Sequence, residues 1–250
     1  MSRRRAGTAR VATLVLAAAL LAACGATPVA QPPTGIDGLT IPTPSPTPAD
    51  FVSSVDNPWF PLVPGTRWTY SRYTPSGSDT LTATVLTRHH RVAGVDTTAV
   101  RWEVRLRSGR TPTLSVRWYA QDTAGNVWWF GQRVIRQSPR VDLLATRSWA
   151  AGRHGAEAGL AMSAAPRVGD GYANGFEPGV VESHSTVLSV DATVALPTRD
   201  YRGTVSTRDL SPLHPVREVR SFYARDIGMV AQQTTEALST DLSLVRVSRS

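Results

Sequence analysis

The fold class is decided by two segments, Arg101-Trp-Glu-Val-Arg-Leu-Arg107 and Thr113-Leu-Ser-Val-Arg-Trp118. Every second residue in each segment is apolar, as with Trp102, Val104 and Leu106 in the first, and charged or hydroxyl residues stand between them. Strict alternation over four to eight residues is typical of a half-buried antiparallel strand. The two segments therefore predict neighbouring strands of an antiparallel sheet.

The same alternation continues on both sides of these segments, at residues 81–85, 190–196 and 242–244. Turn-forming residues separate the runs, at residues 75–77, 108–109, 124–126 and 227–228. Helical periodicity is weak, and three glycines argue against a long helix in 141–165, where one short helix is the most we expect. We predict an all-β protein built of antiparallel curved sheets, either barrel-like or two-lobed.

An internal repeat is suggested by two pairs of similar segments at one spacing. Trp118-Tyr-Ala-Gln-Asp122 is similar to Phe222-Tyr-Ala-Arg-Asp226, and Pro64-Gly-Thr-Arg-Trp68 aligns with Val168-Gly-Asp-Gly-Tyr172, both at an offset of 104 residues. A shared offset indicates duplication of a β-meander of about 100 residues. The alternative is coincidence among residues that are common in strands and turns.

If the repeat is structural, residues 64–132 and 168–236 form equivalent halves. Tyr119 and Tyr223 must then face the same way, because a slip of one residue exchanges the two faces of a strand. The strands that begin near Trp68 and Tyr172 must also have the same neighbours.

The N-terminus has the form of a signal peptide over residues 1–23. Arg3, Arg4, Arg5 and Arg10 are followed by an apolar run from Val11 to Ala23. As a helix these 13 residues span about 20 Å, which is too short for a bilayer core of roughly 30 Å. The run therefore predicts an export signal that is removed, not a permanent anchor.

The end of this run, Leu21-Ala-Ala-Cys24, resembles the lipobox of bacterial lipoproteins. That resemblance implies cleavage between Ala23 and Cys24 and a diacylglycerol with palmitate-type chains on the Cys24 sulfur. Two acyl chains hold a protein firmly at a membrane. We expect a protein anchored to the extracytoplasmic face of the cell membrane. The alternative is an ordinary signal peptide followed by an incidental cysteine.

The remaining chain divides into a tether and a body. Residues 24–50 are rich in proline and threonine, and the run Ile41–Pro48 alternates proline with small hydroxyl residues. Such runs favour extended polyproline II. We expect a stalk there and a β-rich extracytoplasmic domain over residues 51–250.

Composition excludes several kinds of function. The net charge of +8 falls to +4 without the four arginines of the leader, and the remaining basic residues are spread out, which is unlike a nucleic-acid-binding surface. Cys24 is the only cysteine, so no intrachain disulfide and no cysteine-based metal site can form. The adjacent His89 and His90 would point to opposite faces of a strand, and the spacing of the other histidines predicts no metal site. We predict no cofactor and no nucleic-acid partner.

Two longer motifs, Asp56-Asn-Pro-Trp-Phe-Pro-Leu-Val-Pro-Gly-Thr-Arg-Trp-Thr-Tyr70 and Trp118-Tyr-Ala-Gln-Asp-Thr-Ala-Gly-Asn-Val-Trp-Trp-Phe-Gly131, resemble a group of exported bacterial proteins and lipoproteins, many of them actinobacterial. The resemblance extends through residues 168–170 and 222–230. It implies location and β architecture, but no catalytic residues, because no activity is established for that group.

Four side chains are candidates for chemistry or binding. An exposed indole can stack on sugars or acyl chains, so Trp128 and Trp129 are candidate ligand-stacking residues; the alternative is that both are buried. Asp122 and Asp226 could form an acid–base pair, but an aspartate before a glycine turn more commonly caps the turn.

Two functions remain open. The first is a non-enzymatic binding or carrier module whose ligand is an envelope lipid, a glycan or a protein. The second is an envelope hydrolase that acts on glycan or lipid, with Asp122 or Asp226 as the acid.

Overall fold

A computed structural model describes residues 47–74, 77–111, 113–136, 147–234 and 241–249. The chain divides into two units, residues 1–34 and 35–250, and every described residue belongs to the second. Within the described residues no helix is long and apolar enough to cross a membrane. Apart from a one-turn 3-10 helix, η1 (Pro48–Asp50), the regular elements are all β-strands. The all-β prediction is confirmed.

The strands form two successive groups along the chain. The first group is β1 (Phe51–Val52), β2 (Thr66–Thr74), β3 (Gly77–Val85), β4 (His90–Val92), β5 (Val95–Arg105), β6 (Thr113–Asp122), β7 (Val127–Arg136), β8 (Trp149–Ala150) and β9 (Gly159–Met162). The second group is β10 (Gly171–Glu177), β11 (Val181–Ala195), β12 (Asp200–Leu210), β13 (Val219–Ala224), β14 (Gly228–Thr234) and β15 (Asp241–Arg249).

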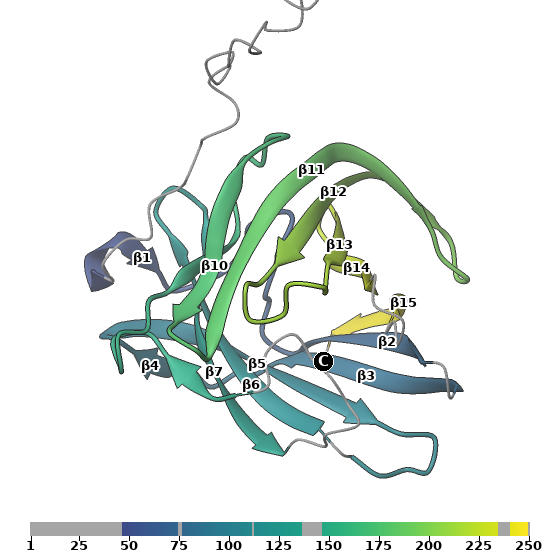
Figure 1. The fold of residues 1–250 in the computed structure, drawn as a ribbon, viewed down its shortest axis with the longest axis horizontal. Coiled ribbons are helices and arrows are strands. Elements are labelled where there is room, and N and C mark those ends of the chain that lie inside the picture. Colours follow the sequence, from purple (N-terminus) through teal and green to yellow (C-terminus); the bar gives the residue numbers. More distant parts are fainter. Residues whose placement is uncertain (1–46, 75–76, 112, 137–146, 235–240, 250) are drawn as a thin grey trace, which may run out of the picture. The chain divides into compact units, whose positions relative to one another are not determined.

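These strands build one antiparallel sheet that curves into a nearly closed barrel (Figure 1). The order across the sheet is β10-β11-β12-β13-β14-β15-β2-β3-β5-β6-β7-β8, and β9 also pairs with β7. The edge at β9 meets β10, because Glu157 and Phe176 exchange two backbone hydrogen bonds of 2.8 and 3.3 Å. Of the two predicted shapes, barrel-like and two-lobed, the structure has the first.

The two groups of strands repeat the same neighbour order. The meander β2-β3-β5-β6-β7 corresponds to β10-β11-β12-β13-β14, and β15 returns to pair with β2. In the first half the place of β15 is shared by the short strands β8 and β9, which both pair with β7. Strand order therefore agrees with the expected repeat.

Side-chain facing agrees as well. Both hairpins carry a bulge at the same place, next to Tyr119 in β6 and next to Tyr223 in β13. Each bulge leaves one fully buried residue unpaired, Phe130 in β7 and Val230 in β14. Both tyrosines point into the barrel, where they contact the same ring, that of Phe60. A single rotation that superposes residues 64–132 on 168–236 stays a prediction.

The offset of 104 residues is not constant along the repeat. It holds for Tyr119 and Tyr223, but it is 100 for Phe130 and Val230 (230 − 130), because the second hairpin has the shorter loop. Small insertions and deletions of this kind leave the register intact only where they fall in turns.

Two predictions differ from the structure, one about a short helix and one about where the tether ends. No helix occurs within the described part of 141–165, residues 147–165, where Gly152 and Gly155 turn the chain between β8 and β9. The last residues assigned to the tether belong to the body instead, because the Asp50 carbonyl accepts a 2.9 Å hydrogen bond from the Thr123 backbone N–H. The rest of the tether lies outside the described residues.

Candidate functional site

A cavity of about 180 Å³ lies inside the barrel and is walled by both halves. Its apolar lining is aromatic and aliphatic, and its polar lining consists of charged, amide and hydroxyl groups. The apolar residues include Leu62, Trp68, Tyr70, Leu81, Val100, Trp102, Trp129 and Met229. The polar residues include Arg117, Asn174, Ser185, Asp209 and Gln232. An apolar pocket with a few convergent polar groups is the usual form of a small-molecule site.

The floor of the cavity is a segment that enters the barrel, residues 55–62, which we call the plug. One side of the plug is fixed by Asn57. Its backbone N–H donates to Gln121 Oε1 (2.8 Å), and its side-chain Nδ2 donates to the carbonyls of Gly125 (2.9 Å) and Ser163 (3.1 Å). The buried Asn57 thus ties the plug to the hairpin β6–β7 and to the segment after β9.

The other side of the plug is fixed by the equivalent hairpin, β13–β14. The Asp226 backbone N–H donates to the Pro58 carbonyl at 2.6 Å, and the Arg225 guanidinium lies 5.6 Å from the Trp59 ring centroid. Asp226 adopts a left-handed conformation (φ 61°) that turns the hairpin there. Both hairpins of the repeat therefore hold the same segment.

Phe60 of the plug lies between the two equivalent tyrosines. Its ring centroid is 5.2 Å from that of Tyr119 and 6.1 Å from that of Tyr223. Burial raises the pKa of both phenols, and the neighbouring Arg117 partly offsets this rise at Tyr119. The two hydroxyls stay protonated and serve as hydrogen-bonding groups of the cavity wall.

The opening of the cavity lies where its lining residues are exposed. Leu210 at the end of β12, and Leu213 and His214 in the loop 211–218, are all exposed. The plug comes from the hairpin end of the strands and this loop from the opposite end. The cavity therefore has a closed end and an open one.

The first half contributes an aromatic and cationic wall. On the inner face of β6, the Arg117 guanidinium lies 4.5 Å from the Trp102 ring centroid and 5.6 Å from that of Trp129. Trp129 packs edge-on against Trp149, with ring centroids 4.9 Å apart, and its indole N–H donates to the Gly131 carbonyl at 2.7 Å. These contacts hold Arg117 between two indole rings at the cavity surface.

The second half contributes an acidic wall. Asp209 on β12 accepts a hydrogen bond from the Ser185 hydroxyl, and Asn174 Nδ2 donates to that same hydroxyl at 2.9 Å. Burial raises the pKa of Asp209 to about 6, although the Ser185 hydrogen bond opposes the rise. Its remaining exposed surface borders the cavity.

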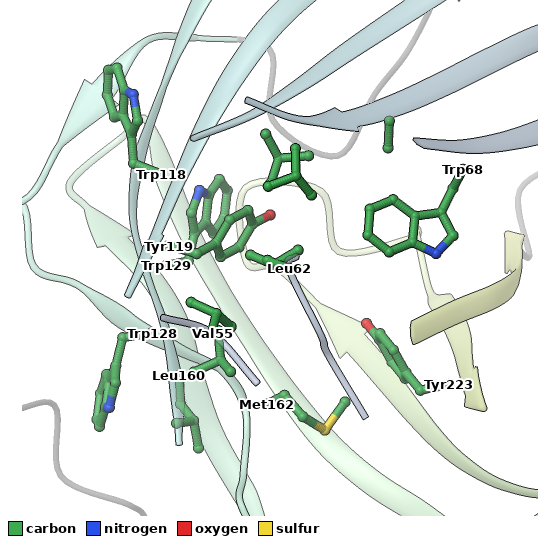
Figure 2. Close-up of a cluster of buried hydrophobic side chains, with 14 of the residues drawn as sticks. Val55, Leu62, Trp68, Trp118, Tyr119, Trp128, Trp129, Leu160, Met162 and Tyr223 are labelled. Carbon is green, nitrogen blue, oxygen red and sulfur yellow. The ribbon is translucent and has the colours of Figure 1, made fainter. Parts of the chain in front are cut away.

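The structure separates the two predicted stacking residues. Figure 2 shows Trp129 beside Tyr119, whereas Trp128 lies apart from them. Trp128 is 4% exposed, its indole N–H donates to Asp122 Oδ2 at 2.8 Å, and it does not line the cavity. Trp129 is 9% exposed and does line it. Of these two residues, Trp129 alone is placed to stack on a ligand within the barrel.

Asp122 and Asp226 are not brought together as an acid–base pair in the cavity. The Asp122 carboxylate accepts from the Asn126 backbone N–H (2.8 Å), the Asn126 side chain (2.9 Å) and Trp128. It therefore closes its own hairpin turn, while Asp226 is exposed in the other hairpin. The turn-capping interpretation of Asp122 is borne out.

Ala23 and Cys24 lie outside the described residues. Among the residues that are described, no group of three histidine, cysteine or acidic side chains is placed to hold a metal ion. His90 stacks on Trp118, with ring centroids 4.6 Å apart, on the outer side of β6.

Arg117 and Asp209 were not singled out by the sequence. Both occupy polar positions in alternating strands, where a charged residue is normally expected to face solvent. The one signal in the sequence for Arg117 was that two aromatic residues, Trp118 and Tyr119, follow it along the strand. This does not show which face of the strand points inward.

Comparisons with known proteins give only weak similarities. No family model matches the chain, and no curated protein matches it. A solved structure from Bacteroides fragilis, described as an exported protein with a YmcC-like fold, is 13% identical, and the match covers 76% of this chain and 99% of that chain with a TM-score of 0.46. A second, from Parabacteroides distasonis and described as a lipoprotein, is 9% identical, with 76% and 98% covered and a TM-score of 0.41. Neither similarity defines an activity for this chain.

Proposed function

We propose that this protein is a lipid-anchored component of the bacterial envelope whose barrel binds a small amphipathic ligand, as a non-enzymatic binding or carrier module on the extracytoplasmic face of the membrane. The N-terminal sequence supports the location, through the charged leader, the short apolar run and the lipobox that ends at Cys24. The cavity supports the binding role.

The observation that carries the binding role is the cavity in the middle of the barrel. An apolar cavity of about 150 Å³ can take up a molecule the size of benzene, and this one is about 180 Å³. Its opening is bordered by exposed Leu210 and Leu213, so a ligand can reach it without unfolding the barrel.

A binding role fits the carboxylates better than hydrolysis does. Asp122 is engaged in its turn, and Glu182, which borders the cavity, accepts a 2.8 Å hydrogen bond from the Gly179 backbone N–H. Asp209 remains as a single carboxyl group in the wall, whereas glycoside hydrolysis generally needs a pair.

Native mass spectrometry of the full chain, purified from its own host, tests the binding role. We expect a co-purifying small molecule on the wild type that is lost from Ala161→Trp, because Ala161 lines the cavity and a bulky ring there fills it. The exposed Ala195 on β11 provides the control Ala195→Trp, which should retain the molecule. A wild type that carries nothing and binds no amphiphile would count against a binding module, and release of a cleaved product would favour a hydrolase.

Fractionation tests the anchor separately. Cys24→Ser removes the sulfur that acylation requires, so we expect the protein to move from the membrane to the soluble fraction. Identical partitioning of mutant and wild type into detergent would show that the leader is an ordinary signal peptide.

A further inference from the structure

Arg117 carries a positive charge on the inner wall of the cavity. On the inner face, Arg117 lies directly opposite Val100 of β5 and Gln132 of β7, and Trp102 and Trp129 flank its guanidinium. This is an unusual place for an arginine, since the surrounding wall is otherwise largely apolar and aromatic.

The charge of Arg117 has no carboxylate partner within the described part of the chain. Arg72, the other arginine on the inner face of the first half, is paired with Asp79 at 2.9 Å. Arg117 instead contacts the indole rings and the Tyr119 hydroxyl. Buried charges in proteins are normally paired, because an isolated one is costly to remove from water.

Hydrogen-bond donors around Arg117 are also unused. Trp102 Nε1, the Ser115 hydroxyl and Arg117 Nε are each buried without a hydrogen-bond partner among the described residues. Trp102 pairs directly with Ser115 across β5 and β6, and Ser115 and Arg117 lie two residues apart on one face of β6. The unpaired donors thus belong to one patch of the wall.

This patch of hydrogen-bond donors and positive charge is suited to bind a negatively charged hydrogen-bond acceptor. Indole N–H and guanidinium groups can only donate, and arginine is particularly suited to carboxylate and phosphate groups. Next to the patch the wall continues through apolar side chains, Leu81, Val100 and Trp68. An acidic head group at Arg117 would therefore place an attached hydrocarbon chain against apolar surface.

We propose that Arg117 is the binding site for the oxyanion head group, carboxylate or phosphate, of a single-chain amphiphile, whose tail lies along the apolar wall of the first half. The inference rests on the proposed binding function and names its ligand class. Trp102 and Trp129 position the guanidinium, and Trp102 supplies a further donor.

The test is a head-group series on one alkyl chain. Hexanoate, hexyl phosphate, hexanol and hexyltrimethylammonium, whose short chains suit a cavity of about 180 Å³, are titrated by calorimetry into the full chain carrying Cys24→Ser, so that no acyl group of its own competes. We expect the two anions to bind at least tenfold more tightly than the alcohol and the cation. The stronger of the two anions distinguishes a carboxylate ligand from a phosphate one.

Substitution of Arg117 gives the second arm. Arg117→Met keeps a linear apolar side chain over the indole rings, and we expect it to lose the tenfold preference for the anions while hexanol binding is unchanged. Arg117→Lys, which keeps the charge but not the planar fork, should retain part of the preference. The control is Arg133→Met, on an exposed position of β7.

The outcomes separate the inference from the function on which it rests. If hexanol binds as well as hexanoate, or if the cation binds best through Asp209, the head-group site is wrong although the cavity binds ligands. If none of the four probes binds, the proposed binding function fails. The preference of the wild type for anionic over neutral and cationic head groups tests the proposal even if Arg117→Met does not fold.

Discussion

The inner walls of the two halves differ at positions that the register makes equivalent. Trp102 lies opposite Ala83 and Ser115 in the first half, and Asp209 takes the corresponding place opposite Ser185 and Val219 in the second. One backbone arrangement thus carries an indole in one half and a carboxyl group in the other.

A second pair of equivalent positions on the inner wall also differs in chemistry. Arg117 on β6 corresponds to Ser221 on β13, since the first lies opposite Val100 and the second opposite Thr207. The two halves thus share their strand order, the hairpin bulge and the inward tyrosines, while side chains at these wall positions differ in charge and polarity. Under the proposed binding function, ligand preference would be set by a few side chains and not by the fold.

The largest difference between the halves should appear at Trp129 and its counterpart Met229. Trp129 is almost fully buried against Trp149, whereas Met229 is only partly buried. We expect Trp129→Ala to lower the free energy of unfolding by about 4 kcal/mol and Met229→Ala by about 1 kcal/mol. Urea denaturation measures both. Equal losses would show that the second half depends on its wall as much as the first does.

The seam between the halves at β9 and β10 is closely packed. A Cβ on Gly159 in β9 would lie 2.3 Å from the backbone of Asn174 and Gly175 in β10, so Gly159→Ala must push the strands apart. We expect a loss of about 3 kcal/mol, at the upper end of the usual cost of overpacking.

The control for this seam is Gly171→Ala, in the facing strand β10. Its Cβ would meet nothing closer than the Ser185 carbonyl at 4.0 Å, so stability should change by less than about 1 kcal/mol. If Gly159→Ala is tolerated equally well, β9 does not close the barrel against β10 in solution.

The acidic wall should show in the pH dependence of stability. The pKa of Asp209 is raised from 3.8 to about 6, so the folded protein holds this proton more tightly than the unfolded chain does. The contribution of Asp209 to the free energy of unfolding should therefore fall as the pH rises from 4 to 6 and stay constant above that, by about 2 kcal/mol in total after allowance for the water of the cavity.

Asp209→Asn should abolish this component, because its side-chain oxygen can still accept from Ser185 but does not ionise in this range. The buried neighbours Tyr172 and Tyr223 do not titrate in this window, since burial raises the pKa of both phenols. Denaturation at a series of pH values gives the difference between wild type and mutant. The exposed Asp200→Asn on the same strand should leave the slope unchanged, and a slope that persists in Asp209→Asn assigns it to another group.

The smallest expected effect distinguishes the two hairpins. Both oxygens of Asp122 accept hydrogen bonds, so Asp122→Asn replaces one acceptor by a donor and should cost about 1 kcal/mol. Asp226 is exposed in a left-handed conformation that asparagine also adopts readily, so Asp226→Asn should stay within about 0.5 kcal/mol of wild type. Equal effects would remove this distinction between the loops.

The alternating sequence pattern was sufficient to predict the strands, but not to predict which face of each strand points into the barrel. The segments at 101–107 and 113–118 correspond to β5 and β6, and the repeated Tyr-Ala segments correspond to β6 and β13. The apolar face of β6, with Val116 and Trp118, nevertheless points out of the barrel, and the face with Arg117 points in. Periodicity identifies two faces, but only the closure of the sheet determines which is inside.

The site was less accessible to sequence reasoning than the strands. Trp129 was identified as a candidate because an exposed indole can stack on a ligand, and it does line the cavity. Its partner Trp128 could not be separated from it, because the bulge at Phe130 and the hydrogen bond to Asp122 depend on contacts that no local pattern contains. Asp209 belongs to the site only because β12 pairs with β11 at Ser185.

The plug has a consequence for the order in which the chain can fold. Its Pro58 carbonyl receives the Asp226 N–H, from a residue 168 positions later (226 − 58), so this contact forms only after nearly the whole chain has left the ribosome. Contacts between such distant residues form late, because a long loop must close before they are made. The plug comes early in the body, but its contact with the second half forms late, and the floor of the cavity is complete only in a molecule whose second half has already folded.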